Sequence, residues 1–203
     1  MVLIDWALPI VAFCASSTFT PGPNNVMVTA SGANFGFRRS IPHILGIAIG
    51  FGVMNMCVGL GLGGVFVAYP ELHVVLKYAS IAYLTYLAWK IARSSRAGKE
   101  EEKGKPFTFF QAAAFQWVNP KAWVIAIGAV STFTTVGGDL LFEVMVISII
   151  FILVTFPSAS TWAVFGLMIG RFLQTPGRLR AFNWTMAGIL MLSLLPATGL
   201  LDY

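Results

Sequence analysis

The stretch Thr20-Pro21-Gly22-Pro23-Asn24-Asn25 decides the fold, because it cannot continue the apolar helix in which it lies. Proline lacks a backbone N–H, and its ring clashes with the carbonyl group four residues earlier. The two prolines of the stretch therefore free the carbonyls of Ser17 and Phe19, and the glycine between them adds conformational freedom. We expect one helix to end before this stretch and a second helix to begin within it.

The segment around this stretch is one of several apolar runs in the chain. Of the 203 residues, 57% are hydrophobic and only 10% are charged. A water-soluble domain of this size cannot bury so much apolar surface. Each run is long enough to cross about 30 Å of hydrocarbon at about 1.5 Å per helical residue. We therefore expect an all-α polytopic membrane protein in a lipid bilayer, with six transmembrane helices at approximately residues 6–33, 41–68, 74–91, 107–133, 142–169 and 181–201.

The basic residues indicate how these spans are oriented. Of the 13 Lys and Arg residues, 11 lie in or beside the first, third and fifth connectors, whereas the termini and the even connectors carry acidic residues. The positive-inside bias places the odd connectors in the cytoplasm and both termini on the outer side of the membrane. Because the net charge of +5 comes from these connectors, nucleic acid is not an expected partner.

A second break lies at Asn119-Pro120-Lys121, at a depth in the fourth span similar to that of the first break in the first span. The polar stretch 93–106 indicates a cytoplasmic loop that joins the halves 1–92 and 107–203 of a single transmembrane domain. Each half holds three spans, so the two halves would be inverted relative to each other. Interrupted helices at matching positions of inverted repeats point to a binding site near the membrane midplane.

The second break has the composition of an anion site. Pro120 frees the carbonyl of Gln116, and Asn119 is suited to cap a half-helix that starts at Pro120. The positive end of that half-helix would coincide with Lys121, and together they suit a carboxylate. A charged lysine near the midplane costs about 2.5–3.5 kcal/mol on insertion scales, so it should face protein or water. In the alternative, Lys121 reaches an interface or only pairs with a structural carbonyl.

The carbonyls freed at the first break suit an ammonium group. In hydrocarbon they are tolerated only where protein or a water-lined cavity satisfies them. The alternative is a packed kink repaired by the hydroxyls of Ser16, Ser17 or Thr18. Because the spans contain no well-buried Asp or Glu, carbonyls and one lysine favour a net-neutral zwitterion over a cation. Proton coupling would then need Lys121 or His43 as the carrier, although His43 is better explained as a structural residue.

Two further features of the spans bear on the site. Pro157 frees the carbonyl of Leu153 among several hydroxyl side chains, and the sequence leaves open whether this segment lines the path or is a self-repaired kink. The glycines of the second span indicate close helix packing. Cys14 and Cys57 lie inside apolar runs without metal-ligand spacing, so we expect no metal and no cofactor. The candidate substrate-binding residues are Ser17, Thr20, Pro21, Gly22, Pro23, Asn24, Asn25, Gln116, Asn119, Pro120, Lys121 and Pro157.

Four motifs along the chain carry a family resemblance: Thr20-Pro21-Gly22-Pro23-Asn24-Asn25, Gly36-Phe37-Arg38, Tyr83-Leu84 through Leu87-Ala88-Trp89-Lys90, and Phe115-Gln116-Trp117-Val118-Asn119-Pro120-Lys121. With these motifs, essentially the whole chain resembles the lysine exporter (LysE) superfamily, in particular its homoserine/threonine exporter (RhtB) branch. The resemblance implies efflux of amino acids across the bacterial inner membrane, driven by the proton motive force. Residues 20–25 and 88–92 are most similar to exporters of cysteine and O-acetylserine, which implies small neutral substrates.

Other classes of function have less support in the sequence. A membrane-embedded enzyme would need catalytic groups, and the spans hold no HExxH motif, no paired carboxylates and no Ser/His/Asp set. A non-transporting membrane partner or a channel for small solutes is the remaining alternative, although channels usually show a charged or carbonyl ring formed by oligomers. The oligomeric state, a homodimer included, stays open.

Overall fold

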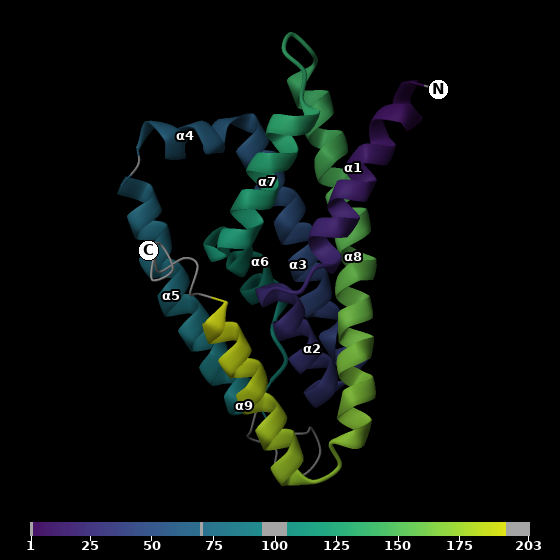
Figure 1. The fold of residues 1–203 in the computed structure, drawn as a ribbon, viewed down its shortest axis with the longest axis vertical. Coiled ribbons are helices and arrows are strands. Elements are labelled where there is room, and N and C mark those ends of the chain that lie inside the picture. Colours follow the sequence, from purple (N-terminus) through teal and green to yellow (C-terminus); the bar gives the residue numbers. More distant parts are fainter. Residues whose placement is uncertain (1, 70, 95–104, 194–203) are drawn as a thin grey trace.

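The structure is a computed structural model that describes residues 2–69, 71–94 and 105–193. All regular secondary structure in these residues is helical, and Figure 1 shows an elongated bundle in which most helices run along the long axis. The elements are α1 (Val2–Phe19), α2 (Pro23–Phe35), α3 (Phe37–Cys57), a π-helical turn η1 (Val58–Leu62), α4 (Gly63–Ala68), α5 (Glu71–Ala92), α6 (Phe109–Val118), α7 (Pro120–Phe133), α8 (Leu140–Phe172) and α9 (Pro176–Leu192).

The predicted apolar segments map onto these helices. The first segment forms α1 and α2, the second forms α3 to α4, the fourth forms α6 and α7, and α5, α8 and α9 account for the others. Among the described residues, two helical stretches are long and apolar enough to cross a membrane. These are Phe37–Val65, with mean hydropathy 1.9, and Leu140–Phe172, with mean hydropathy 2.5. Residues 95–104 of the predicted loop and residues 194–201 of the predicted sixth span lie outside the described residues.

The second apolar segment is bent, whereas the sequence predicted a continuous span to residue 68. The bend lies in η1, where Gly61 has φ 120° and ψ −9°. Side chains other than glycine rarely adopt this region, so the glycine allows the change in direction. Beyond it, α4 lies across the long axis of the bundle (Figure 1). The glycines of this segment thus allow a change in backbone direction as well as close helix packing.

Close helix packing at glycine is confirmed in the second segment. A Cβ atom on Gly46 would lie 2.3 Å from the carbonyl oxygen of Phe109, and one on Gly50 would lie 2.6 Å from the Cα atom of Ala113. These contacts bring α3 against α6. Small residues allow helix backbones to approach in this way, and the approach increases van der Waals contact.

The closest packing in the bundle joins α2 to α8. A Cβ atom on Gly32 would lie 2.0 Å from the carbonyl oxygen of Ala163, and one on Gly166 would lie 2.0 Å from that of Thr29. One turn further along α8, a Cβ atom on Gly170 would lie 2.6 Å from the carbonyl oxygen of Ala33. The two backbones are therefore in direct contact over several turns. Since α1 and α3 also pack on α8, this helix is the central support of the fold.

The apolar core forms separate clusters on the two sides of the breaks. One cluster gathers buried side chains of α1, α3, α7 and α8, including Phe51, Trp123 and Phe151. Another gathers side chains of α2, α5, α6 and α9, including Leu84 and Phe115. Each break therefore joins a helix of the first cluster to a helix of the second. Polar groups at the breaks are held between two well-packed regions.

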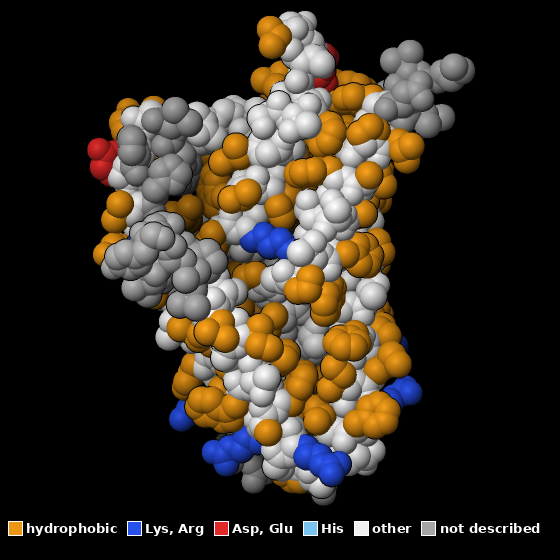
Figure 2. Space-filling view, viewed as in Figure 1, with side chains coloured by type: hydrophobic (Ala, Val, Ile, Leu, Met, Phe, Trp, Pro, Cys, Tyr) orange, Lys and Arg blue, Asp and Glu red, His pale blue; other side chains and the backbone are white. Residues whose placement is uncertain are grey.

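On the surface, charged side chains gather mainly at the two ends of the molecule, and apolar side chains cover the length between them. Figure 2 shows most basic side chains at the lower end of the molecule, the acidic ones at the upper end, hydrophobic ones between, and one basic side chain at mid-height. Large apolar residues along α8, such as Leu153, Phe165 and Met168, are more than 40% exposed. Such a continuous apolar surface is typical of contact with lipid or with another protein. Most basic residues lie at the same end of the molecule, which agrees with the clustering of Lys and Arg in the odd connectors.

Candidate functional site

The first helix break occurs where the two prolines predicted it. Helix α1 ends at Phe19, and α2 begins at Pro23, whose missing N–H costs nothing in the first turn of a helix. Gly22 precedes α2 in extended backbone, with φ −177° and ψ −179°. A Cβ atom on Gly22 would lie 3.0 Å from Cδ and 3.1 Å from Nζ of Lys121. The glycine therefore leaves room for the lysine that comes from the other break.

Asn25 satisfies backbone groups that the first break exposes. Its side chain is buried, and its Nδ2 donates to the carbonyls of Thr18 at 3.0 Å and Thr20 at 2.9 Å. The hydroxyl of Ser17 donates instead to the carbonyl of Phe13, one turn earlier, at 2.7 Å. An amide from α2 thus closes the end of α1, whereas the sequence analysis had considered only the nearby hydroxyls for this task.

The second break also has its predicted form. Helix α6 ends at Val118, and α7 begins at Pro120. Asn119 between them has φ −89° and ψ 107°, and its Oδ1 accepts a hydrogen bond of 3.2 Å from the backbone N–H of Lys121. The prediction that Asn119 caps the half-helix is therefore confirmed. The free N–H groups of the first turn of α7 give this end of the helix a partial positive charge.

Lys121 connects the two breaks. Its Nζ donates to the carbonyl of Thr20 at 2.8 Å and lies 3.3 Å from that of Pro21. The sequence predicts that carbonyls freed at the first break, such as those of Ser17 and Phe19, suit the ammonium group of a ligand. The neighbouring carbonyls of Thr20 and Pro21 are engaged by an ammonium group of the protein itself. Charge-assisted hydrogen bonds of this kind are stronger than neutral ones. The contact ties the end of α1 to the start of α7.

A second polar bridge joins α2 to α6. The side-chain amides of Asn24 and Gln116 pair reciprocally, with Asn24 Nδ2 2.8 Å from Gln116 Oε1 and Gln116 Nε2 3.0 Å from Asn24 Oδ1. Gln116 is fully buried and also donates to the carbonyl of Ala112 at 2.9 Å. Both partners lie one turn or less from a break. The four helix ends are therefore linked by polar groups whose hydrogen bonds can be exchanged for bonds to a ligand.

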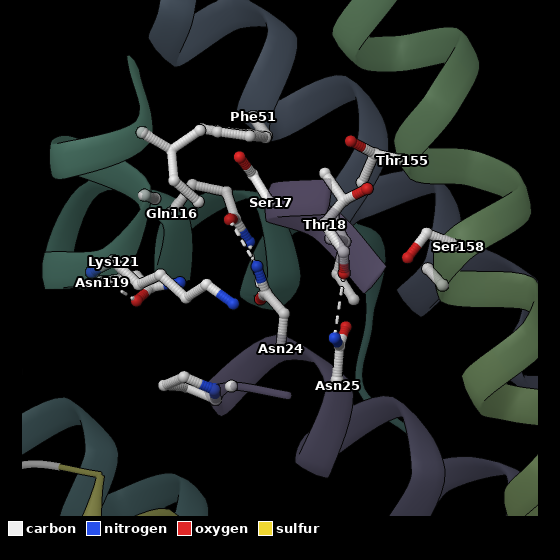
Figure 3. A pocket seen from close by; sticks show the side chains of 16 residues that line it. Ser17, Thr18, Asn24, Asn25, Phe51, Gln116, Asn119, Lys121, Thr155 and Ser158 are labelled. Atoms are coloured by element: carbon white, nitrogen blue, oxygen red, sulfur yellow. Dashed lines mark hydrogen bonds between the residues drawn. The ribbon is translucent and has the colours of Figure 1, made fainter. Parts of the chain in front are cut away.

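The breaks border a small cavity that is lined by both polar and apolar residues. Figure 3 shows Lys121 and Asn119 on one side, Thr155 and Ser158 of α8 on the other, and Asn24 and Asn25 between them. The cavity leaves about 40 Å³ for the centres of water-sized molecules, and one water needs about 10–15 Å³ on this measure. It has room for a few waters or for one small solute. The lining residues are Ser17, Thr18, Gly22, Pro23, Asn24, Asn25, Ile47, Phe51, Gln116, Asn119, Lys121, Ala122, Ile125, Thr155, Ser158 and Ala159.

Most of the candidate residues from the sequence meet at this cavity. Thr20 and Pro21 do not line it but contribute the carbonyls that hold Lys121. Pro120 starts α7 without facing the cavity. Pro157 is exposed on α8 and is not a lining residue, and α8 continues through it without a break. The candidates that do line the cavity are Ser17, Gly22, Pro23, Asn24, Asn25, Gln116, Asn119 and Lys121.

The sequence analysis did not assign several of the lining residues. Thr155 and Ser158 stood out only as hydroxyls near Pro157, and Phe51 carried no signal beyond its hydrophobicity. Helix α8 is apolar on all sides, so its sequence does not show which face turns inward. The face is determined by the glycine contacts with α2. The unassigned lining residues are Thr18, Ile47, Phe51, Ala122, Ile125, Thr155, Ser158 and Ala159.

His43 lies away from the cavity. Its ring is fully buried, with Nδ1 2.8 Å from the hydroxyl oxygen of Ser31 and the ring centroid 4.9 Å from that of Phe107. Within the described part of the chain, Nε2 has no hydrogen-bond partner. Lys121 is the only residue with an ionisable amine, imidazole or carboxyl group among those that line the cavity.

Comparison with known proteins gives one consistent result. The LysE type translocator family matches residues 15–195. Cysteine/O-acetylserine efflux proteins of Escherichia coli strain K12, Shigella sonnei strain Ss046 and Shigella flexneri are each 31% identical to the chain over 163 residues. These alignments cover 80% of this chain and 83% of each relative. No solved structure matches the chain.

Proposed function

Because this chain belongs to the LysE type translocator family, we propose that it exports small neutral amino acids across the bacterial inner membrane. The relatives are cysteine/O-acetylserine efflux proteins, and both of those solutes are small and zwitterionic. The cavity supports the same class of substrate, because it is small, carries amide and hydroxyl groups in its wall, and is lined by a single amine without a carboxylate among the residues named above. The substrate is moved without chemical conversion.

The observation that carries this proposal is the contact between Lys121 and the carbonyls of Thr20 and Pro21. A zwitterion carries both partners of that contact, namely an ammonium group and a carboxylate. It can insert between them, with its carboxylate on the ammonium of Lys121 and its own ammonium on the two carbonyls. Each internal charge-assisted hydrogen bond is thereby replaced by an equivalent bond to substrate. The first turn of α7 adds favourable electrostatics for the carboxylate.

The membrane architecture in this proposal has six spans in two inverted halves. Helices α1 and α2 form the first span, and α6 and α7 form the fourth, so the broken spans have corresponding places in the two halves. The halves are joined by the connector at 93–106, and both termini lie in the periplasm. Most basic side chains lie at the same end of the molecule in Figure 2, which supports this orientation. Broken helices at matching places are typical of transporters that bind substrate at the midplane.

We further propose that export is coupled to proton entry and that Lys121 carries the proton, since it is the ionisable residue at the cavity. One proton entering against one neutral solute leaving moves one charge, worth about 2.3 kcal/mol per 100 mV. At about 1.4 kcal/mol per tenfold, this supports a gradient of roughly fifty-fold. Such a gradient is sufficient to relieve a cell of excess metabolite.

The test is counterflow of labelled amino acids in proteoliposomes that contain the purified protein, with and without an imposed pH difference. We expect uptake of small neutral amino acids and a faster net flux when a pH difference is imposed. Replacing Lys121 by Met, which keeps the length of the side chain, should lower counterflow by at least about tenfold. That factor corresponds to the loss of one charge-assisted hydrogen bond of about 1.4 kcal/mol or more.

Lys105→Met is the matched control, because Lys105 is exposed and lies outside the cavity. It should transport like the wild type. Undiminished counterflow by the Lys121→Met variant would remove Lys121 from the mechanism. Electrical conductance without counterflow would instead favour a channel. A flux of equal rate with and without the pH difference would exclude proton coupling.

A further inference from the structure

Two hydroxyl groups on α8 face the cavity without a hydrogen-bond partner. Thr155 is 4% exposed and Ser158 is 1% exposed, and both line the cavity. Among the described residues, neither Thr155 Oγ1 nor Ser158 Oγ has a partner. The two residues are three positions apart and therefore share one face of the helix. Figure 3 shows them across the cavity from Lys121.

These hydroxyls differ from most others in the bundle. A Ser or Thr inside a helix usually satisfies itself by donating to the carbonyl four residues earlier. Thr155 and Ser158 do not make this bond, and a polar group that is buried without a partner is unfavourable, above all in a membrane. A ligand in the cavity would remove that penalty. The residues that make the usual bond include Ser17, Thr18, Ser40, Ser80, Thr85, Thr161 and Thr185.

The chemistry of this side of the cavity defines what fits there. Each hydroxyl can donate one hydrogen bond and accept others, and neither carries charge. The groups for the substrate's carboxylate and ammonium lie on the opposite side, at Lys121 and the carbonyls it holds. Phe51 restricts the space, because its ring is 3% exposed and is held against Phe151 at a centroid distance of 4.9 Å. A large side chain would collide with this packed aromatic pair.

We propose that Thr155 and Ser158 form the side-chain subsite of the transport cavity and select amino acids whose side chain is small, uncharged and carries a hydroxyl or thiol group. This inference rests on the proposed function and deepens it. A substrate with such a group pairs with the two hydroxyls. An apolar substrate of the same size leaves them without partners and is transported less well, because a site built for hydrogen bonding rejects an analogue that lacks the group.

The experiment compares isosteric substrates in proteoliposomes. Counterflow is measured for serine and for cysteine, each against 2-aminobutyrate, in which a methyl group replaces the hydroxyl or thiol, and the ratio within each pair is the readout. The wild type should prefer the polar member by about fivefold or more, the factor expected from one neutral hydrogen bond. In Thr155→Val and Ser158→Ala the ratio should fall toward one, while transport of 2-aminobutyrate persists. Thr155→Ser, which keeps the hydroxyl, should retain the preference.

Ser160→Ala is the matched control on the same helix. Ser160 Oγ is likewise buried without a partner among the described residues, but Ser160 does not line the cavity. This variant should keep the wild-type ratio. If the wild type transports both members of each pair equally, or if Ser158→Ala keeps the preference, the subsite is wrong while amino-acid export stands. If the wild type transports no amino acid, the proposed function itself fails.

Discussion

At the scale of single residues, two consecutive asparagines have separate tasks. Asn25 points back to the end of α1, where it donates to the carbonyls of Thr18 and Thr20. Asn24 points across to Gln116 on α6. The first maintains the break within one chain segment, and the second connects that break to the other half. We expect the first contact to persist when a ligand enters, because it satisfies carbonyls at the end of α1, whereas the second joins two side chains that can turn toward a ligand.

Replacing Asn25 by Ala should therefore reduce stability. The substitution removes the two hydrogen bonds that Asn25 Nδ2 donates to the carbonyls of Thr18 and Thr20, and each such bond contributes about 0.5–1.5 kcal/mol. We expect the midpoint of thermal unfolding in detergent to fall by several degrees. Ser16→Ala is the control, since Ser16 is exposed and donates to one carbonyl within its own helix. Equal midpoints for the two variants would contradict the role assigned to Asn25.

Some of these residue-scale features were predictable from the sequence, and others were not. The missing N–H of proline and the capping preference of asparagine are local properties, so the breaks and the cap at Asn119 could be predicted. The partners of Lys121 depend on a contact with residues about one hundred positions away, and no local rule supplies them. From the sequence alone, a ligand and a structural carbonyl are therefore both possible partners for this lysine.

At the scale of helices, α2 and α8 are in backbone contact because glycine occupies the contact points. The sequence analysis assigned close packing to the glycines of the second span but did not single out Gly166 or Gly170. A glycine in an apolar helix has the same local appearance whether it faces lipid or a neighbouring helix. Gly188 of α9 illustrates this, because a Cβ atom there would have no neighbour within 4 Å.

Gly166→Ala and Gly188→Ala form a matched pair for testing this packing. A Cβ atom at position 166 would lie 2.0 Å from a backbone oxygen, so α2 and α8 must separate to accommodate it. Overpacking of this kind typically costs about 1–3 kcal/mol, whereas alanine in an open helical position is neutral or favourable. Thermal unfolding in detergent should show a lower midpoint for Gly166→Ala only. A midpoint equal to that of the wild type would contradict the close contact.

At the scale of the whole molecule, the helical class and the positions of the apolar segments follow from composition and pattern. The bend at Gly61 does not, because a run of glycines favours packing and bending equally. The proposed six-span topology rests on the same pattern together with charge. It is supported by the gathering of most basic side chains at one end of the molecule and of the acidic ones at the other (Figure 2).

The topology predicts which connectors each side of the membrane can reach. In a background without Cys14 and Cys57, a cysteine at Val136 should react with an impermeant maleimide in intact cells, because this residue is fully exposed in a connector that the proposed orientation places in the periplasm. A cysteine at the exposed Gln174 should react only after the membrane is permeabilised. The opposite labelling pattern at the two sites would show that the protein has the inverse of the proposed orientation.

The glycine contacts between α2 and α8 determine how an alternating-access cycle can run. Two helices whose backbones interlock cannot slide past each other, so any rearrangement that opens the cavity must move α2 and α8 as one body. The hydrogen bonds of Lys121 to the carbonyls of Thr20 and Pro21 lie outside that contact and can change without disturbing it. In the proposed transport cycle, a bound zwitterion that takes over these hydrogen bonds would unlatch the start of α7 from the end of α1.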